Sequence, residues 1–249
     1  MDFSRYSVPG SDETFYIPDF ITKDEEEYLI RKIGETPQPK WKQLAKRRRV
    51  PSRGDLTPNS ILIPQAMPSF LSEYPDLIAR LKATGAFGGS PHQQPNHVIL
   101  NQYLPGQGIM PHEDGPAYYP VVATLSLGSH TVMHYYQYSS SPSGSDTGET
   151  DGKGRAIDPT PILSLLLEPR SLVITTSALY TRHLHGIDAL EDDDFGRGAG
   201  VANVELLTGA GRDVVEGART LPRRVRYSLT CRDVTRVANV VAGRTFGKR

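Results

Sequence analysis

The chain has 249 residues, and its 28 lysines and arginines are balanced by 28 aspartates and glutamates, so the formal net charge at pH 7 is zero. This balance excludes bulk electrostatic attraction to nucleic acid or to a membrane and leaves any such attraction to local patches. The only cysteine, Cys231, excludes an intramolecular disulfide and a thiolate zinc site.

The length is enough for one sizeable domain, and the 23 glycines and 20 prolines favour a β-rich architecture with many turns. We predict a mainly β (α+β) fold, with a flexible tail over residues 1–14 and a single domain over residues 15–249. The N-terminus lacks the apolar run of a signal peptide, and no segment approaches 18 consecutive apolar residues. We therefore expect a protein that is neither secreted nor membrane-spanning.

The N-terminal part of the domain reads as a helical layer over residues 15–95. A plausible strand covers residues 15–20, and Thr22 with Glu25 forms a capping box before apolar residues at helical spacing, which predicts a helix over residues 23–35. A second helical pattern covers residues 69–83 and is interrupted at Pro75.

Residues 40–53 contain seven basic side chains and no acidic one, with Trp41 among them. A basic run with an aromatic residue can contact phosphates and stack on a base, which makes this stretch a candidate lid for a nucleic acid. The same composition is equally typical of a solvated loop or a nuclear import signal.

From His97 onward the hydrophobic period changes to two, which predicts short strands. They cover residues 97–103, a segment around residue 112, and residues 121–128, 131–138, 161–168, 171–176 and 223–232. Strands of this number and spacing suggest a double-stranded β-helix, or jelly roll, whose core spans residues 96–235. Two stretches rich in glycine and polar residues, 139–160 and 191–217, read as insertions in this core.

Two short polar pairs stand out at the start of the β-rich region. In extended chain, alternate residues share a face, so Asn101 and Tyr103 point the same way, as do His112 and Asp114. Residues two apart in a strand are separated by about 6.5 to 7 Å along the backbone, so His112 and Asp114 can reach one cation. With a second histidine they would form the two-His-one-carboxylate face that binds Fe(II) and leaves positions open.

The last predicted strand alternates polar with mostly apolar residues. Its polar face holds Arg224, Arg226, Ser228, Thr230 and Arg232. This pattern fits an edge strand with one wet face, and it fits equally a barrel strand whose inward arginines pair with carboxylates of a bound dianion.

These motifs together resemble the Fe(II) and 2-oxoglutarate dioxygenases of the AlkB family. The matching stretches include Asn101 to Tyr103, Gly-Ile-Met-Pro-His-Glu-Asp-Gly-Pro around His112, His-Gly-Ile at His185, and Arg-Tyr-Ser-Leu-Thr-Cys-Arg from Arg226 to Arg232. The resemblance covers most of the chain outside the tails and the two insertions.

The resemblance implies roles for eight residues. It makes His112, Asp114 and His185 the ligands of Fe(II) and the catalytic centre. It assigns 2-oxoglutarate, the cosubstrate used with O2, to Asn101, Tyr103, Arg226, Ser228 and Arg232, with Arg226 on the distal carboxylate. His183 shares a strand face with His185 and is an alternative ligand, although only His185 is followed by Gly-Ile.

The implied activity is oxidative demethylation of methylated RNA or single-stranded DNA, with release of succinate, CO2 and formaldehyde. Base-repair members carry an acidic residue two positions after the metal aspartate, where this chain has Pro116, and this weakens the expectation of DNA repair. The alternatives are a nucleic-acid-binding protein with a vestigial or structural metal site, and an oxygenase acting on a protein side chain.

The expected partner is nucleic acid, contacted by basic residues of the 40–53 stretch. These are Lys40, Lys42, Arg47, Arg48 and Arg49. We expect no membrane partner, a monomer, and a location in nucleus and cytoplasm.

Overall fold

Helix α1 (Lys23–Gly34) begins at the predicted capping box. Thr22 Oγ1 accepts a hydrogen bond from the Glu25 backbone N–H at 3.2 Å, and Glu25 Oε2 accepts one from the Thr22 N–H at 2.8 Å. The two bonds satisfy donors that the first helical turn leaves unpaired. Leu29 and Ile33 then face the core, so the predicted helix is confirmed. The computed structural model describes residues 2–52, 54–139, 155–196 and 200–239.

The second helical stretch forms two short helices with Pro75 between them. Helix α2 (Ser69–Ser72) precedes it, and α3 (Leu77–Thr84) begins after Asp76, whose Oδ1 accepts from the Ala79 N–H at 3.0 Å. The other helical segments are α4 (Ser177–Thr181), α5 (Gly209–Glu216), and the 3-10 turns η1 (Phe3–Tyr6), η2 (Gln38–Lys40) and η3 (Val204–Leu206). In the described parts of the chain no helix has the length and apolar character needed to cross a membrane.

The larger of two facing sheets has seven antiparallel strands. Their order is β1 (Thr14–Ile17), β9 (Leu172–Thr176), β6 (Tyr118–Leu127), β13 (Arg226–Val234), β4 (His97–Tyr103), β3 (Arg47–Ser52) and β2 (Lys42–Leu44). The last strand, β13, therefore lies between β6 and β4 in the middle of the sheet. The alternative prediction, that this strand lies at a sheet edge with one face in solvent, is therefore wrong.

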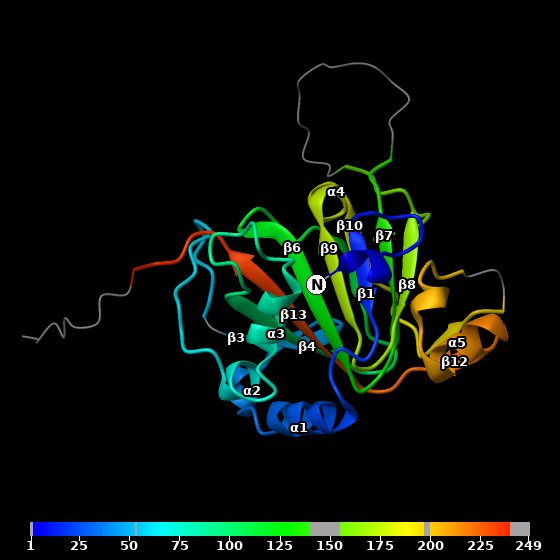
Figure 1. Cartoon of the computed structure of the whole chain (residues 1–249), viewed down its shortest axis with the longest axis horizontal. Helices are drawn as coiled ribbons and strands as arrows, with labels where there is room; N and C mark the ends of the chain where they lie inside the picture. Colours follow the sequence, from blue (N-terminus) through cyan, green and yellow to red (C-terminus); the bar gives the residue numbers. More distant parts are fainter. Residues whose placement is uncertain (1, 53, 140–154, 197–199, 240–249) are drawn as a thin grey trace, which may run out of the picture.

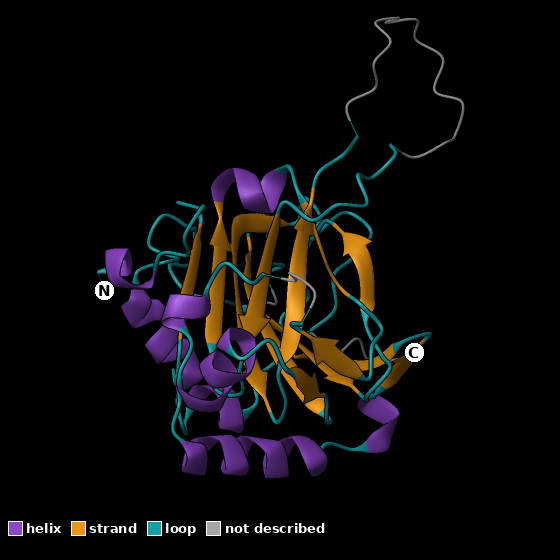
Figure 2. Ribbon diagram, turned by 90° about the vertical axis from the view of Figure 1, so that its right-hand side faces the viewer, coloured by secondary structure: helices purple, strands orange, loops and turns teal. Residues whose placement is uncertain are grey.

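The smaller sheet has four strands, in the order β5 (Ile109–His112), β10 (Leu184–Ile187), β7 (Thr131–Tyr136) and β8 (Leu163–Leu167). A separate pair is formed by β11 (Asp192–Asp194) and β12 (Thr220–Pro222). The two larger sheets meet through side chains such as Tyr135 of β7, whose hydroxyl lies 2.6 Å from Thr175 Oγ1 of β9. The predicted mainly β double-sheet fold is confirmed (Figures 1 and 2).

Apolar side chains form two buried clusters, one on each side of the seven-stranded sheet. The first packs α1, α2 and α3 against the outer face of the sheet, through residues such as Leu81, Leu100 and Leu229. The second includes side chains between the two sheets and on the outer face of β7 and β8. Burial of these faces, at roughly 25 cal/mol per Å² of apolar surface, is the main term that holds the layers together. Figure 2 shows most of the helices at one side of and below the strands, with one helix above them.

Residues 2–14 do not form the flexible tail expected from their polarity. They contain η1, and Val8 is only 1% exposed because its side chain joins the second cluster. The Val8 backbone N–H donates to the carbonyl of Thr14, the first residue of β1, at 3.0 Å.

The 191–217 insertion, expected to be a loop, contains β11, η3 and α5. Phe195, Val201 and Leu207 bury their side chains in the second cluster. The Asn203 side chain accepts from the Leu166 N–H at 3.0 Å and donates to the Leu166 carbonyl at 2.9 Å, and the Ala202 N–H donates to the Ser164 carbonyl at 2.8 Å. Of the 139–160 insertion, residues 140–154 lie outside the described residues, and residues 138 and 157 form a bridge beside them.

The basic stretch forms a β-hairpin, so the expectation of a solvated loop is wrong. Strands β2 and β3 pair with each other, and β3 pairs with β4, with Arg49 opposite Asn101 and Val50 opposite Leu100. Because side chains alternate along a strand, Arg49 shares the face of Asn101, whereas Val50 joins the apolar cluster on the other face. The hairpin therefore presents some of its arginines to the space between the sheets.

Candidate active site

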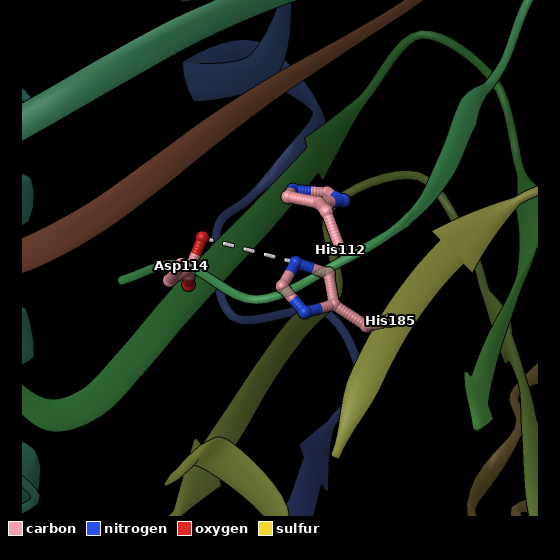
Figure 3. Close-up of side chains that lie close together, drawn as sticks. All are labelled: His112, Asp114 and His185. Carbon is pink, nitrogen blue, oxygen red and sulfur yellow. Dashed lines mark ion pairs between the residues drawn. The ribbon is translucent and has the colours of Figure 1, made fainter. Parts of the chain in front are cut away.

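Three side chains that could ligate a metal, here called the metal-ligating group, come together on the smaller sheet. His112 ends β5 and is directly opposite His185 of β10, and Asp114 follows two residues later. Their potential ligand atoms all lie within 4.8 Å of one another, the one such group among the described residues, and the side chains point toward each other in Figure 3. The His183 ring is not part of this group. Its Nδ1 hydrogen-bonds the Ala178 carbonyl at 3.1 Å.

Two glycines allow the strands that carry the histidines to approach closely. A Cβ on Gly108 would lie 2.2 Å from the Ile187 carbonyl oxygen, and one on Gly186 would lie 3.0 Å from the Pro111 nitrogen. The β5–β10 register also shifts between the His112–His185 and Ile109–Ile187 pairs, which is a bulge in β5. Such bulges commonly redirect a side chain beside an active site.

Burial keeps both imidazoles neutral, which is the form that binds a metal. Burial lowers the pKa of His112, and it lowers the pKa of His185 to about 4. His112 Nδ1 lies 2.9 Å from the Met110 carbonyl oxygen, so this nitrogen carries the proton and Nε2 is left to face a cation.

Arg232, which lies on the larger sheet, binds the Asp114 carboxylate. Its Nε donates to Asp114 Oδ2 at 2.9 Å, and a second guanidinium nitrogen donates to Oδ1. Burial by itself would raise the pKa of Asp114, but Arg232 and the two histidines outweigh it and keep that pKa below its usual range. Two neutral imidazoles and an ionised carboxylate form a donor set that fits Fe(II).

Arg226 is a buried cation without an anionic partner among the described residues. It is 3% exposed, one terminal nitrogen donates to Ser126 Oγ at 2.9 Å, and its Nε has no hydrogen-bond partner. Burial lowers its pKa to about 10, so the guanidinium remains protonated at neutral pH. A desolvated, fork-shaped cation with a free donor fits a carboxylate ligand.

The other residues predicted for 2-oxoglutarate surround Arg226 on β4 and β13. Tyr103 is opposite Arg226, and Asn101 is opposite Ser228, with Asn101 Nδ2 3.3 Å from Ser228 Oγ. Arg232 lies further along β13 and is 6% exposed. The structure thus brings all eight predicted residues to the inner faces of the two sheets.

Several residues of the site have no local sequence signal. Ser126 is opposite Ser228 on β6, and Tyr118 places its ring 4.9 Å from the Arg232 guanidinium carbon. Arg47 and Arg49 each have a buried Nε without a hydrogen-bond partner. Side chains alternate between the two faces of a strand, so Arg47 and Arg49 could have been predicted to point inward only if residues 47–50 had been predicted as a strand.

Two further histidines lie away from the metal-ligating group. His134 is opposite Gly186, whereas its neighbour Tyr135 is opposite His185, so His134 faces the outer side of the small sheet. Its Nδ1 lies 2.8 Å from Ser164 Oγ. His130 Nε2 lies 3.0 Å from Asp193 Oδ2.

Comparison with known proteins adds relatives of the whole chain. A model of the 2OG-Fe(II) oxygenase superfamily matches residues 13–232. The chain is 36% identical over 249 residues to the "Probable RNA/DNA demethylase ALKBH6" of Danio rerio, covering 98% of this chain and 96% of the relative. It is 26% identical over 224 residues to the "Uncharacterized protein L905" of Acanthamoeba polyphaga mimivirus, covering 88% and 83%. The solved structure of OsALKBH1 superposes with a TM-score of 0.52 and 14% identity, covering 91% of this chain and 100% of that one, which shows a shared fold.

Proposed function

Because the chain belongs to the 2OG-Fe(II) oxygenase superfamily and, within it, to the AlkB family, we propose that it removes methyl groups from bases of RNA or single-stranded DNA. The protein is an Fe(II)- and 2-oxoglutarate-dependent dioxygenase that uses O2. The observation that carries the proposal is the buried Arg226, which has no anionic partner among the described residues and lies on the sheet that faces the His112, Asp114 and His185 group.

We assign Fe(II) to His112, Asp114 and His185. The two imidazoles are held in their neutral form by burial, and Arg232 fixes the orientation of the Asp114 carboxylate. Three protein ligands on one side of the metal leave positions for the cosubstrate and O2.

We assign 2-oxoglutarate to the residues of β4 and β13 around Arg226. Arg226 would bind its distal carboxylate, with Ser126 holding the guanidinium in place. Asn101, Tyr103 and Ser228 lie beside Arg226 and offer short polar groups to the rest of the molecule. Arg232 would lie near the metal-chelating end, because it already contacts Asp114.

When bound, Fe(II), 2-oxoglutarate and O2 supply the oxygen atom and the oxidation that convert an N-methyl group to formaldehyde, with succinate and CO2 as co-products. The protein's own residues hold the reactants in place and keep water out. The apolar and aromatic side chains behind His185, such as Met133, Tyr135 and Leu179, are buried and close that side of the site.

The hairpin of β2 and β3 supports nucleic acid as the substrate. Arg48 lies 4.8 Å from the Trp41 ring centroid, and Lys40 and Lys42 are exposed beside them. Cations that contact phosphates give affinity without sequence preference, and a nearby aromatic ring can stack on a base. A target base would have to be unpaired or flipped out to reach the metal.

The test is anaerobic binding of 2-oxoglutarate to the Fe(II)-loaded protein. Arg226→Ala leaves a carboxylate unpaired, so we expect binding to weaken by about 2 to 5 kcal/mol, and His112→Ala should abolish metal-dependent binding. Arg224→Ala, which removes an exposed arginine two residues away, is the matched control and should bind normally.

In air, methylated single-stranded RNA or DNA oligonucleotides should then stimulate succinate release. An Arg226→Ala protein that binds 2-oxoglutarate like the wild type would refute the cosubstrate assignment. Intact cosubstrate binding without stimulation by any methylated oligonucleotide would refute the nucleic-acid substrate and favour oxidation of a protein side chain.

A further inference from the structure

Helix α4 connects the two sheets and leads directly to one of the candidate metal ligands. It follows β9 of the large sheet, and β10 of the small sheet begins at Leu184 after two linking residues (Figure 1). The second residue of β10 is His185. The ring of His183, in the link, turns back to the helix, since its Nδ1 lies 3.1 Å from the Ala178 carbonyl oxygen. A displacement of α4 would therefore reach His185 through a short connection.

Side chains of α4 also form part of the wall behind the His185 ring. Leu179, Tyr180 and His185 line one small cavity of about 20 Å³. Leu179 and Tyr180 are both buried. Packed side chains with so little free space between them transmit a displacement from one to the next. The position of α4 therefore determines how the His185 ring is supported.

The first turn of α4 is held by a carboxylate that lies 165 residues away in the sequence. Glu13 Oε1 accepts a hydrogen bond from the Ala178 N–H at 3.0 Å, and its Oε2 accepts one from the Leu179 N–H at 2.7 Å. A helix leaves these donors unpaired at its start. Thr176, the residue before the helix, does not cap it, because its Oγ1 donates to the Glu13 carbonyl at 3.2 Å. The Glu13 carboxylate takes the place of the usual cap, with two charge-assisted bonds.

The backbone at the start of α4 is strained where Glu13 binds it. Ser177, the first residue of the helix, has a φ of +56°. Residues other than glycine rarely adopt this left-handed conformation, and it persists only where surrounding contacts impose it. The N–H groups on both sides of Ser177, those of Thr176 and Ala178, donate to Glu13. Without the carboxylate, Ser177 could relax and α4 could turn.

We infer, on the premise that His112, Asp114 and His185 bind Fe(II) as proposed above, that Glu13 is a positioning residue of the metal site. Glu13 fixes α4, and α4 fixes His185 through the chain and through side-chain packing. The residues assigned to 2-oxoglutarate lie on β4 and β13, and β9 and β6 separate these strands from β1, which follows Glu13. Loss of the Glu13 carboxylate should therefore weaken metal binding and leave cosubstrate binding unchanged.

The experiment is an anaerobic titration with Co(II), followed by its visible absorption. Glu13→Gln keeps the size of the side chain but removes its charge and turns an NH2 group toward a backbone N–H. We expect the Co(II) dissociation constant to rise about three- to tenfold, and the absorption spectrum of bound Co(II) to change because the His185 ring is reoriented. Asp12→Asn removes an exposed carboxylate from the neighbouring residue and is the matched control, so it should bind Co(II) like the wild type.

Two further measurements separate positioning from a general loss of structure. With Co(II) at saturation, the dissociation constant of 2-oxoglutarate for Glu13→Gln should stay within about twofold of the wild-type value. In the metal-free protein, hydrogen exchange should become faster at the backbone amides of residues 177–185 and stay unchanged at residues 97–103 of β4. Local opening of α4 and its link produces this pattern, whereas destabilisation of the whole fold affects both segments.

A second substitution tests whether the strained residue is the link between Glu13 and α4. Glycine adopts a positive φ without strain, so Ser177→Gly removes the tendency of this residue to relax. Ser177→Gly alone should bind Co(II) like the wild type. In combination with Glu13→Gln it should bind Co(II) more tightly than Glu13→Gln does alone, and the spectrum of bound Co(II) should return toward that of the wild type.

The possible failures are distinguishable. Wild-type protein that does not bind Co(II) would overturn the proposed metal site, and the inference with it. Wild-type binding that is unchanged in Glu13→Gln would overturn the inference alone and leave the proposed function standing. A parallel fall in Co(II) affinity, 2-oxoglutarate affinity and the free energy of unfolding would also overturn the inference, because Glu13 would then only support the fold.

Discussion

Arg223 and Arg226 are three residues apart and both buried, but only one has an anionic partner among the described residues. Arg223 donates to both carboxylate oxygens of Asp193, at 2.8 and 2.7 Å, whereas Arg226 donates only to the Ser126 hydroxyl. A buried cation costs stability unless an anion balances it. Arg226 is therefore destabilising to the fold in the absence of a ligand, which fits the carboxylate of 2-oxoglutarate that we propose to bind there.

Ser126→Ala tests how much the cosubstrate site depends on the positioning of Arg226. The variant removes the hydrogen-bond acceptor that orients the guanidinium, and hydrogen bonds to charged groups are worth about 1.5 to 3 kcal/mol. We expect the dissociation constant of 2-oxoglutarate to rise about tenfold or more in an anaerobic titration. Ser164→Ala, which removes a hydroxyl bonded to His134 on the outer face, is the control. Unchanged binding in Ser126→Ala would contradict the positioning role.

Sequence patterns predicted the grouping of His112, Asp114 and His185 because motif residues and their order are visible along the chain. They could not predict Ser126, which is 100 residues from the arginine that it contacts.

At the scale of elements, the β5–β10 pair determines how the two candidate histidine ligands face each other. The two histidines lie directly opposite each other, and the bulge and the glycines allow the strands to meet. The glycine of the Gly-Ile-Met-Pro motif is therefore explained by the backbone of the neighbouring strand. No sequence pattern of β5 alone could reveal this contact, since the clashing atom belongs to Ile187.

Gly108→Ala should disturb this pairing. The added Cβ would lie 2.2 Å from a backbone oxygen, so β5 must shift relative to β10 and move His112 away from His185. We expect metal affinity, measured by Co(II) or Mn(II) titration, to fall at least about tenfold while the protein remains folded by circular dichroism. Gly34→Ala, where nothing lies within 4 Å of the added atom, should bind metal normally. Normal metal binding by Gly108→Ala would contradict this account of the motif.

The hairpin of β2 and β3 shows why some elements escape sequence analysis. Arg47, Arg48 and Arg49 are chemically alike, so the alternation between the inner and outer faces is invisible in the hydrophobic pattern. The strand is formed because Val50 packs in the core and the backbone pairs with β4. By contrast, the clear period of residues 97–103 predicted β4 to the residue.

At the scale of the molecule, the proposed site is divided between two sheets. The candidate metal ligands belong to the small sheet and the turn after β5, whereas the residues assigned to 2-oxoglutarate belong to the large sheet. The Asp114–Arg232 ion pair crosses between them. Away from the site, Asp193 of β11 joins His130 and Arg223, which ties the 191–217 segment to the turn between β6 and β7 and to the chain before β13.

Asp193→Asn should destabilise the whole fold. Burial alone would raise the pKa of Asp193, but Arg223 and His130 outweigh it and lower that pKa below 3.8. A folded-state pKa below the unfolded value gives stability that is present above about pH 4 and is lost as the pH falls through the folded pKa. We expect a loss of about 3 to 5 kcal/mol in the free energy of unfolding at pH 7, and a smaller difference from wild type at pH 3.

Urea denaturation at the two pH values measures this difference. Asp192→Asn, which changes an exposed neighbour, is the control and should stay within about 0.5 kcal/mol of wild type. A difference for Asp193→Asn that is the same at both pH values would contradict the charge-based explanation.

Ala202 and Asn203 also cover the free edge of β8, the last strand of the small sheet. A terminal strand normally exposes a row of unpaired backbone groups that can recruit a strand from a second molecule. Here the Ser164 carbonyl and both backbone groups of Leu166 are already occupied, by one backbone N–H and one side-chain amide. These groups are therefore not available to a strand from a second molecule, because a segment that looked like a loop in the sequence already occupies them.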